Sequence, residues 1–418
     1  MENFEDEISS LDEETTSLLN NDSSEKKSDD INPDLLDDDI QDTRSELKFD
    51  IALESEEETE KRTEIERALE DQHSLLGTWQ NFAISSYGLV ADDLRYKVWP
   101  LLLEVDPSHD ERIPSLEELS GHSEYQQVVL DVNRSLKRFP PGIPYKQRVA
   151  LQDQLTVLIL RVIMKYPNLR YYQGYHDVAI TFLLVVGEVM AFRIMEKLST
   201  NHLRDCMEPT MEKTSHRLNY IYALLSRVDA DLHNFMDSAS VGTMFALPWY
   251  LTWFGHSLNQ YKDVVRLYDY FLASPPDMSL YVATSLVVHR RKEVFAEGSD
   301  MASIHCTLSQ IPDNLDFEEI LERASAFHKK YPMVKLEHLV KKRVQKEIDQ
   351  RKKDEQIMRR RLNRNKSMWV RLNNNLPMWL VFKGRYGLLF AAATVLLGYL
   401  FYIKASEKKF SLRNLFNT

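Results

Sequence analysis

The stretch Asn168-Leu169-Arg170-Tyr171-Tyr172-Gln173-Gly174-Tyr175-His176-Asp177 joins two strongly apolar segments through a polar, aromatic turn with one glycine. Pro167 ends the first segment, because its ring cannot continue a helical ladder of hydrogen bonds. The second segment, 178–186, is apolar nearly all round, as expected of a helix at the centre of a domain. In the first segment apolar side chains recur at three- and four-residue spacing, which predicts a helix with one buried face: Leu151, Leu155, Leu158, Ile159, Val162, Ile163 and Tyr166.

This pattern places Gln173 on a tight turn between two rigid helices. A glutamine amide both donates and accepts hydrogen bonds, so it can orient a water molecule or a ligand. The same amide can instead serve only to satisfy backbone groups of the turn. The turn alone leaves both interpretations open.

The composition favours a mainly helical protein. The 418 residues exceed one ordinary domain, glycine occurs only 12 times, and no run of alternating strand patterns is present. Cys206 and Cys306 form neither a disulfide framework nor a zinc pattern, so we expect core or surface thiols of a reducing compartment. The acidic N-terminus lacks the apolar centre of a secretory signal.

The net charge of -12 is the sum of unlike parts. Residues 1–60 contain 23 acidic and 4 basic side chains, a net charge of -19, so the remainder carries +7. Few aromatic residues accompany these acidic runs, and such a segment buries too little apolar area to offset its ordering entropy. We therefore predict a disordered acidic tail over residues 1–65, which is either simply solvated or engages a basic partner.

The pattern of residues 128–139 predicts a helix. Val128 and Val132 lie on its apolar face, and residues 140–142 end it. Asp131, Arg134 and Arg138 fall on a different, polar face of that helix. Taken alone, this face is typical of a solvated surface with an Asp–Arg pair that stabilises by roughly 0.2–0.5 kcal/mol.

Other segments predict further helices. A glycine turn at Gly88, followed by acidic residues and an apolar face, indicates an entry helix within 87–102. The aromatic-rich segment 245–254 is typical of a core, and amphipathic or buried helices are predicted at 264–271 and 281–288.

The C-terminal part changes character twice. Residues 335–371 hold 14 basic and 5 acidic side chains, for which nucleic-acid binding is one interpretation. Residues 387–403 then form an uncharged run of 17 residues, about 25 Å long as a helix and near the lower limit for a bilayer. With the apolar residues 379–382 this predicts a transmembrane segment over 379–403. Basic clusters beside a membrane fix cytoplasmic orientation and attract anionic lipid, so we expect 331–378 to be a juxtamembrane helix that binds no nucleic acid. A short tail, 404–418, completes the chain.

Three stretches taken together resemble the TBC domain of Rab GTPase-activating proteins. The first is the pattern of Val128, Asp131 and Arg134, and the second is Tyr171, Gln173 and Gly174, 39 residues beyond the arginine. The third is an entry pattern of a glycine turn followed by Leu-Arg and Trp: Gly88, Leu94, Arg95 and Trp99. The aromatic segment 245–254 resembles a later helix of the family. Each motif alone is weak, but their order and spacing over residues 85–320 are specific.

The resemblance implies an all-α, multi-helix domain over residues 66–330 and gives its residues roles. Arg134 would be an arginine finger and Gln173 a glutamine finger that replaces the glutamine of the GTPase. Asp131 would aim Arg134 through a charge-assisted hydrogen bond. The remaining motif residues would support the fingers or contact the Rab: Tyr171, Tyr172, Gly174 and Asp177.

The resemblance also implies partners. GTP and Mg²⁺ would arrive with the Rab in its GTP form, because this chain has no phosphate-binding G-x-x-x-x-G-K-[ST] loop. We expect no cofactor or metal site of its own, and we expect an activator rather than an enzyme that hydrolyses a substrate alone. The C-terminal membrane segment resembles the class anchored at the endoplasmic reticulum, which acts on Rabs of ER-to-Golgi traffic. One departure is His176, where many members have Asn. The alternative function is a non-catalytic, membrane-anchored Rab-binding scaffold.

Overall fold

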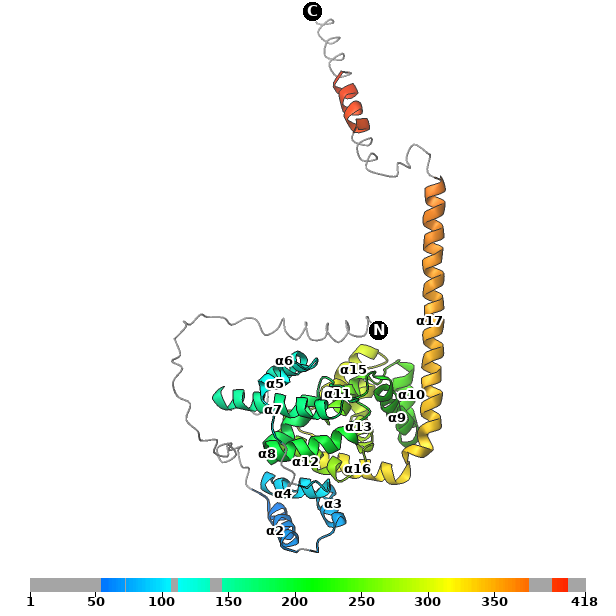
Figure 1. Ribbon diagram of the computed structural model, residues 1–418. Coiled ribbons are helices and arrows are strands. Elements are labelled where there is room, and N and C mark those ends of the chain that lie inside the picture. The colour runs from blue at the N-terminus through cyan, green and yellow to red at the C-terminus, as the bar shows by residue number, and fades with distance from the viewer. Residues whose placement is uncertain (1–53, 72, 107–111, 136–144, 376–392, 405–418) are drawn as a thin grey trace, which may run out of the picture. The chain divides into compact units, whose positions relative to one another are not determined.

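The computed structural model describes residues 54–71, 73–106, 112–135, 145–375 and 393–404 (Figure 1). Within these ranges the chain is helical and contains no strand, which confirms the all-α prediction. The elements, labelled as in Figure 1, are α2 (Glu56–Glu70), α3 (Leu76–Ile84), α4 (Asp92–Leu102), α5 (Leu116–Leu119), α6 (Tyr125–Ser135), α7 (Tyr145–Lys165), α8 (Tyr175–Thr200), α9 (Glu212–Val228), α10 (Ala230–Ser238), η2 (Met244–Ala246), α11 (Leu247–Leu251), α12 (Tyr261–Leu272), α13 (Met278–His289), α14 (Arg291–Ala296), α15 (Met301–Ser309), α16 (Phe317–Lys330) and α17 (Met333–Asn375).

Helix α2 begins earlier than the predicted end of the acidic tail. Ser55 caps it, since its hydroxyl accepts from the Glu58 backbone N–H while the Glu58 carboxylate accepts from the Ser55 N–H. Acidic side chains in a first helical turn also complement the helix dipole. The run Glu56–Glu58, which its composition predicted to be part of a disordered tail, is therefore the start of a helix that buries Ile65. Residues 1–53 of the predicted tail lie outside the described residues.

Helices α7 and α8 pack against each other and provide the centre of the domain (Figure 1). The spacing of apolar residues predicted α7, and a nearly continuous apolar run predicted α8. Their core positions Leu158, Val162, Val178 and Phe182 are fully buried. Among the described residues, α8 is the one helix long and apolar enough to cross a membrane. Because 67% of its apolar stretch is buried inside the protein, packing accounts for this composition.

Aromatic rings fill the space between α8 and the later helices. Phe182 contacts Trp99 of α4 at a centroid distance of 5.2 Å and Tyr268 of α12 at 5.4 Å. Trp253 meets the Tyr268 ring edge-on at 5.4 Å. Trp249 stacks on Phe254 of the same segment at 5.6 Å, so the predicted core role of residues 245–254 is confirmed.

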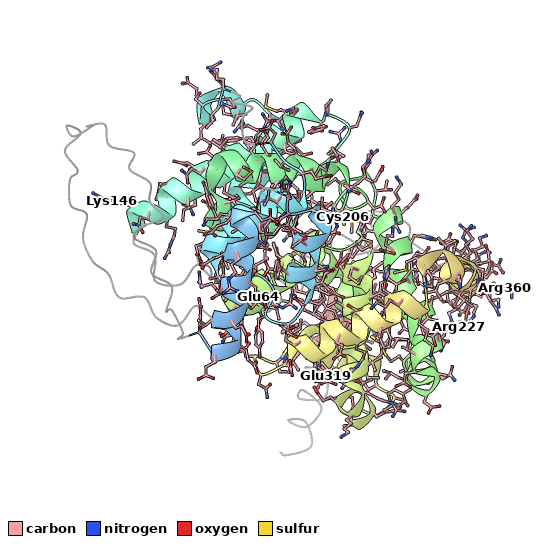
Figure 2. All side chains as sticks on the ribbon, turned by 90° about the horizontal axis from the view of Figure 1, so that it is seen from below. Glu64, Lys146, Cys206, Arg227, Glu319 and Arg360 are labelled. Carbon is pink, nitrogen blue, oxygen red and sulfur yellow. The ribbon has the colours of Figure 1, made fainter. Side chains whose placement is uncertain are left out.

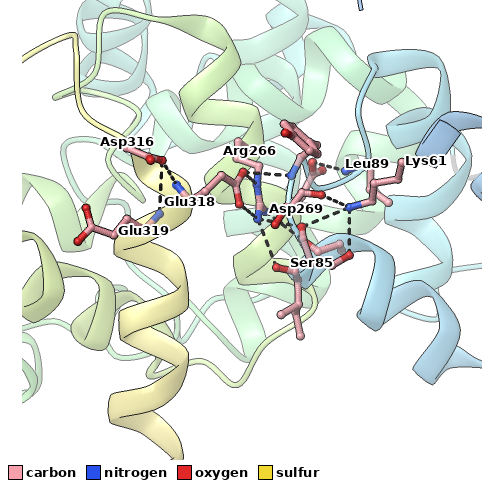
Figure 3. A network of polar contacts seen from close by, with 12 residues as sticks. Lys61, Ser85, Leu89, Arg266, Asp269, Asp316, Glu318 and Glu319 are labelled. Carbon is pink, nitrogen blue, oxygen red and sulfur yellow. Dashed lines mark hydrogen bonds and ion pairs between the residues drawn. The ribbon is translucent and has the colours of Figure 1, made fainter. Parts of the chain in front are cut away.

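The entry motif around α4 surrounds a fully buried carboxylate, that of Asp269 (Figure 3). Asp269 accepts hydrogen bonds from Trp99 Nε1 at 2.7 Å, the Leu89 backbone N–H at 2.9 Å and Arg95 Nε at 3.1 Å. Gly88 has a φ of +54°, and a Cβ there would lie 2.5 Å from the carboxylate. A buried charge needs such partners, so this motif serves the core of the fold.

A second set of polar contacts beside Asp269 ties α2 and α16 to this core (Figure 3). Arg266 donates to the Glu318 carboxylate at 2.6 Å and to the Ala83 carbonyl at 3.0 Å. Lys61 of α2 donates to the Phe82 carbonyl at 3.0 Å. Burial of the Lys61 amine and the nearby Arg266 charge lower the pKa of Lys61 to about 8.

Helix α17 starts inside the packed domain. Met333, Leu336 and Val340 are buried, and the Arg343 guanidinium lies 3.5 Å from the centroid of the Tyr222 ring on α9. The packed unit thus continues past residue 330, where we expected the domain to end, because flanking basic residues hid the short apolar repeat. Further along the helix, the side chains of residues 348–363 are exposed, among them the charged Arg360 (Figure 2).

The predicted transmembrane segment is described only at its end. Residues 376–392 lie outside the described residues, and Ala393–Lys404 form a short apolar helix. Its side chains Val395 and Phe401 are 74% and 79% exposed, so protein packing does not account for its composition among the described residues.

Candidate functional site

Arg134 lies on the last turn of α6 and is exposed to solvent. The helix is fixed by its opposite face, where Val128 and Val132 are 0% and 1% exposed. This is the amphipathic arrangement predicted from the sequence. Arg138, which was expected on the same polar face, lies outside the described residues.

Leu130 is an exposed apolar residue one turn before Arg134. Its side chain is 52% exposed, and residues four apart on a helix lie on the same face. Its position off the Val128–Val132 face is a sequence signal for this exposure. It gives the surface beside Arg134 an apolar element.

The spacing of Asp131 and Arg134 had suggested that Asp131 lies on a solvated face, but it does not. It is 1% exposed, and its carboxylate accepts hydrogen bonds from the Tyr171 hydroxyl at 2.9 Å and from Gln127 Nε2 at 3.2 Å. In the described part of the chain no hydrogen bond or ion pair joins Asp131 to Arg134. Asp131 is therefore bonded to a tertiary partner, Tyr171, where the spacing had suggested a local one.

Gln173 lies on the turn between α7 and α8, as predicted, and its side chain is exposed. Gly174 follows it with a φ of +104°, a conformation that side chains disfavour, and serves as the N-cap of α8. A Cβ at Gly174 would lie 2.8 Å from the Thr252 methyl group. The glycine is therefore required both by the backbone conformation and by the close approach of the segment after α11.

The two tyrosines before Gln173 anchor the turn to two different helices. Tyr171 bonds to Asp131 of α6, and Tyr172 donates to the Leu251 carbonyl at 2.9 Å. Both rings meet Tyr175 edge-on, at 6.3 Å and 5.7 Å. Burial and the adjacent Asp131 carboxylate raise the pKa of Tyr171 far above its usual range, so its hydroxyl stays protonated. The exposed Gln173 is held by buried neighbours.

The segment after α11 forms the other wall of the turn. Trp253 and Phe254 have φ values of 49° and 66°, which for residues with side chains is a strained, left-handed backbone. This path brings His256 Nδ1 to 3.1 Å from Asp177 of α8. His256 lies 79 residues from Asp177 in the sequence, and no sequence signal pointed to it.

His176, the departure from the family pattern, joins these two sides. It is 6% exposed. Its Nδ1 lies 2.8 Å from the Tyr171 hydroxyl oxygen, and its Nε2 lies 3.5 Å from an Asp177 carboxylate oxygen. A continuous polar chain thus runs from Asp131 through Tyr171, His176 and Asp177 to His256.

The chemistry that this site offers is that of two exposed groups on a rigid support. Arg134 supplies a permanent positive charge with a planar fork of donors, and Gln173 supplies an amide. Among the described residues no group of three or more His, Cys, Asp or Glu side chains is arranged to hold a metal ion. Groups of these two kinds can contact charged oxygens and a water molecule.

Comparisons with known proteins identify the family of the domain that holds these residues. A model of the Rab-GTPase-TBC domain matches residues 92–295. TBC1 domain family member 20 of Homo sapiens is 48% identical over 272 residues, which cover 65% of this chain and 68% of that protein. The chain belongs to the Rab-GTPase-TBC domain family.

More distant members of the Rab-GTPase-TBC family share the domain. The GTPase-activating protein gyp10 of Schizosaccharomyces pombe is 31% identical over 257 residues, covering 60% of this chain and 67% of that protein. The solved Ypt/Rab-GAP domain of Gyp1p aligns with a TM-score of 0.54 at 16% identity, over 66% of this chain and 99% of that domain. The structural likeness identifies the fold, and the sequence identity identifies the family.

Proposed function

We propose that this chain accelerates GTP hydrolysis by a Rab of ER-to-Golgi traffic, with Arg134 and Gln173 inserted in trans. One observation carries the proposal: both side chains are exposed, while Asp131 and Tyr171, which adjoin them in sequence, are bonded to each other. Exposed polar side chains on a rigid backbone are better placed to contact a partner molecule than to stabilise the fold.

Each group answers one need of the reaction. Hydrolysis spreads negative charge over the γ-phosphoryl group and the bridging oxygen, and an arginine in trans accelerates it roughly 10³–10⁵-fold. Gln173 would orient the attacking water in place of the glutamine of the Rab. The Rab in its GTP form would bring GTP and Mg²⁺, so the chain acts as an activator.

The supporting residues would act by holding Arg134 and Gln173 in position. Asp131 would fix α6 through Tyr171 rather than through a direct bond to Arg134. Tyr172 and Gly174 would set the turn of Gln173, and Asp177 would connect α8 to His256. Leu130 would supply an apolar contact to the Rab beside Arg134.

Membrane lipid is the second proposed partner. Residues 379–403 would anchor the chain in the endoplasmic reticulum membrane, with the TBC domain in the cytosol. The exposed apolar side chains of Ala393–Lys404 and the basic residues of α17 support this assignment. If it is correct, alkaline carbonate will leave the full chain in the membrane pellet. Release of the full chain into the supernatant would exclude a membrane-spanning segment.

The proposal is tested by single-turnover GTP hydrolysis with a panel of GTP-loaded Rabs and the full chain in detergent. Arg134→Ala should still fold, because Arg134 is exposed. It should still bind its Rab, because the finger acts in the transition state, but it should lose most of the roughly 10³-fold or larger stimulation. Arg134→Lys should not restore it, since an ammonium lacks the guanidinium fork. Unchanged stimulation with Arg134→Ala would overturn the assignment of Arg134, whereas a wild-type chain that binds Rabs without stimulating hydrolysis would favour the non-catalytic scaffold.

A further inference from the structure

His256 presents a partly exposed imidazole ring on the segment that adjoins the turn of Gln173. Its side chain is 52% exposed, and its Nδ1 lies 3.1 Å from Asp177 Oδ2. Asp177 follows Gln173 by four positions, in the first turn of α8. The two segments also touch where the Tyr172 hydroxyl donates to the Leu251 carbonyl at 2.9 Å. The ring is therefore held against the helix into which the Gln173 turn leads.

The backbone that leads to His256 is fixed along residues 252–255. The Gly255 N–H donates to the Thr252 carbonyl at 2.9 Å, and the His256 N–H donates to Thr252 Oγ1 at 3.2 Å. A Cβ at Gly255 would lie 3.1 Å from both the Thr252 carbonyl oxygen and the Tyr268 hydroxyl, so the chain passes close to α12 at this point. These contacts hold the backbone of His256 in one position.

The same segment contains the strained residues Trp253 and Phe254, with φ values of 49° and 66°. Their rings are 3% and 0% exposed, so burial of both rings stabilises a backbone path that side chains disfavour. The bond from the exposed ring of His256 to Asp177 adds little to the stability of the fold in comparison. This path nevertheless places a polar ring next to the Gln173 turn, and strained backbone of this kind is typical of functional sites.

The bond to Asp177 determines which nitrogen of the His256 ring carries a proton. A carboxylate oxygen only accepts hydrogen bonds, so Nδ1 is the donor. In the neutral ring Nε2, the nitrogen farther from the backbone, then carries the lone pair and accepts. The neutral ring therefore matches a hydrogen-bond donor on a partner, such as a backbone N–H or a hydroxyl group.

We propose that His256 contacts the GTP-loaded Rab beside Gln173, accepts a hydrogen bond from it and so contributes to the choice of Rab. Asp177 is the positioning residue of this contact, because it orients the ring. The inference rests on the proposed function, since the Rab that Gln173 serves would meet His256 on the adjoining segment. It predicts an effect on the binding of the Rab and not on the chemical step.

Two substitutions of His256 each remove one partner of the ring. The amide of His256→Asn can donate to Asp177 in place of Nδ1 but has no atom at the position of Nε2. The longer side chain of His256→Gln can place its amide oxygen near the position of Nε2 but gives up the bond that Nδ1 makes to Asp177. The matched control is His338→Ala, because His338 is exposed on α17, which packs against α9.

The first measurement is GTP hydrolysis by a responsive Rab, with the full chain in detergent. Because one hydrogen bond to the Rab is lost, His256→Asn should raise the KM about fivefold and keep kcat within about twofold, whereas His256→Gln should raise the KM less. The preference for this Rab over the others of the panel should shrink by the same factor, and His338→Ala should change neither constant. An unchanged KM in His256→Asn, or a fall in kcat in its place, would overturn the inference.

A second readout is independent of hydrolysis. Diethyl pyrocarbonate reacts with accessible imidazole nitrogens, and mass spectrometry measures the modified fraction of each histidine. When a Rab loaded with a non-hydrolysable GTP analogue is bound, modification of His256 should slow several-fold, whereas that of His338 should not change. Equal modification of His256 with and without the bound Rab would overturn this inference and leave the proposed function standing. If the wild-type chain binds and stimulates no Rab of the panel, the proposed function fails, and this inference fails with it.

Discussion

The Tyr171 hydroxyl lies 2.9 Å from the Asp131 carboxylate, although 40 residues separate them in the sequence. Tyr171 precedes Gln173 by two positions, and Asp131 precedes Arg134 by one helical turn. The bond therefore connects the supports of both proposed fingers. A change at this contact should affect the two groups together.

Substitution of the two tyrosines tests this connection. Tyr171→Phe leaves the buried Asp131 and His176 each without this partner and should lower the free energy of unfolding by about 1–3 kcal/mol. Tyr172→Phe removes one bond to the Leu251 carbonyl and should cost about 1 kcal/mol. We expect Tyr171→Phe alone to reduce the single-turnover rate at saturating protein about tenfold or more. Equal effects of the two variants on that rate would argue against a special role for Tyr171.

The role of Gln173 can be read from the response of an altered Rab. If Gln173 orients the water, a Rab whose own catalytic glutamine is replaced by Ala should still be stimulated by the wild-type chain. Gln173→Ala should abolish stimulation of both Rab forms while leaving stability within about 0.5 kcal/mol, because its side chain is exposed. An altered Rab that no longer responds to the wild-type chain would indicate that Gln173 serves the turn alone.

Leu130 should act in Rab binding rather than in the reaction. Leu130→Asp places a charge on the exposed face beside Arg134 and should raise the KM for the GTP-loaded Rab about tenfold with little change in kcat. The control is Val334→Asp, because Val334 is 89% exposed at the start of α17. A fall in kcat without a change in KM would contradict this prediction.

Gly174 should tolerate no side chain. Gly174→Ala combines a φ of +104° with a contact of 2.8 Å to the Thr252 methyl group, so it should lower the free energy of unfolding by about 1–3 kcal/mol. Thr252→Ser removes that methyl group and keeps the hydroxyl that donates to the Pro248 carbonyl. The double variant should recover part of the loss in thermal unfolding. No recovery would assign the whole effect to the backbone conformation.

The lowered pKa of Lys61 predicts that the free energy of unfolding depends on pH, and it fixes the sign of that dependence. Its pKa is about 8 in the folded chain, against roughly 10.4 when unfolded. Between these values the unfolded chain binds more protons, so the contribution of Lys61 to stability rises with pH. Urea unfolding of the wild type and Lys61→Met at pH 7.5, 8.5 and 9.5 should show the wild type gaining relative to the variant. A constant difference would show that the Lys61 amine titrates normally.

Features set by local spacing could be predicted from the sequence. The periodicity around Leu158 and Val162 predicted α7, and the uniform apolarity after Asp177 predicted the centre of α8. The turn between them required a glycine at 174, and the structure places Gln173 on its exposed side. Local periodicity suffices because a helix repeats its contacts every few residues.

Features set by distant partners could not be predicted in this way. The spacing of Asp131 and Arg134 suggested a shared solvated face, but Asp131 is buried and accepts a hydrogen bond from Tyr171. His256 meets Asp177 only because a strained backbone at Trp253 and Phe254 directs it there. The start of α2 was missed because its acidic first turn resembled the composition of a disordered tail.

The early turns of α17 have a consequence for everything that follows them on the same helix. Val340 is buried and Arg343 is fixed to Asp237 at 2.9 Å, so the helix cannot rotate about its axis independently of the domain. The directions of the later side chains that the structure describes on this helix, up to residue 363, are thereby set relative to α9. Deleting one residue after Lys346 would turn all of them by about 100°, whereas deleting seven would return them close to their original directions, about 20° away. The length of this basic helix and the direction of its side chains about the axis can therefore be changed separately. A series of deletions can shorten the helix while keeping the side-chain directions nearly constant.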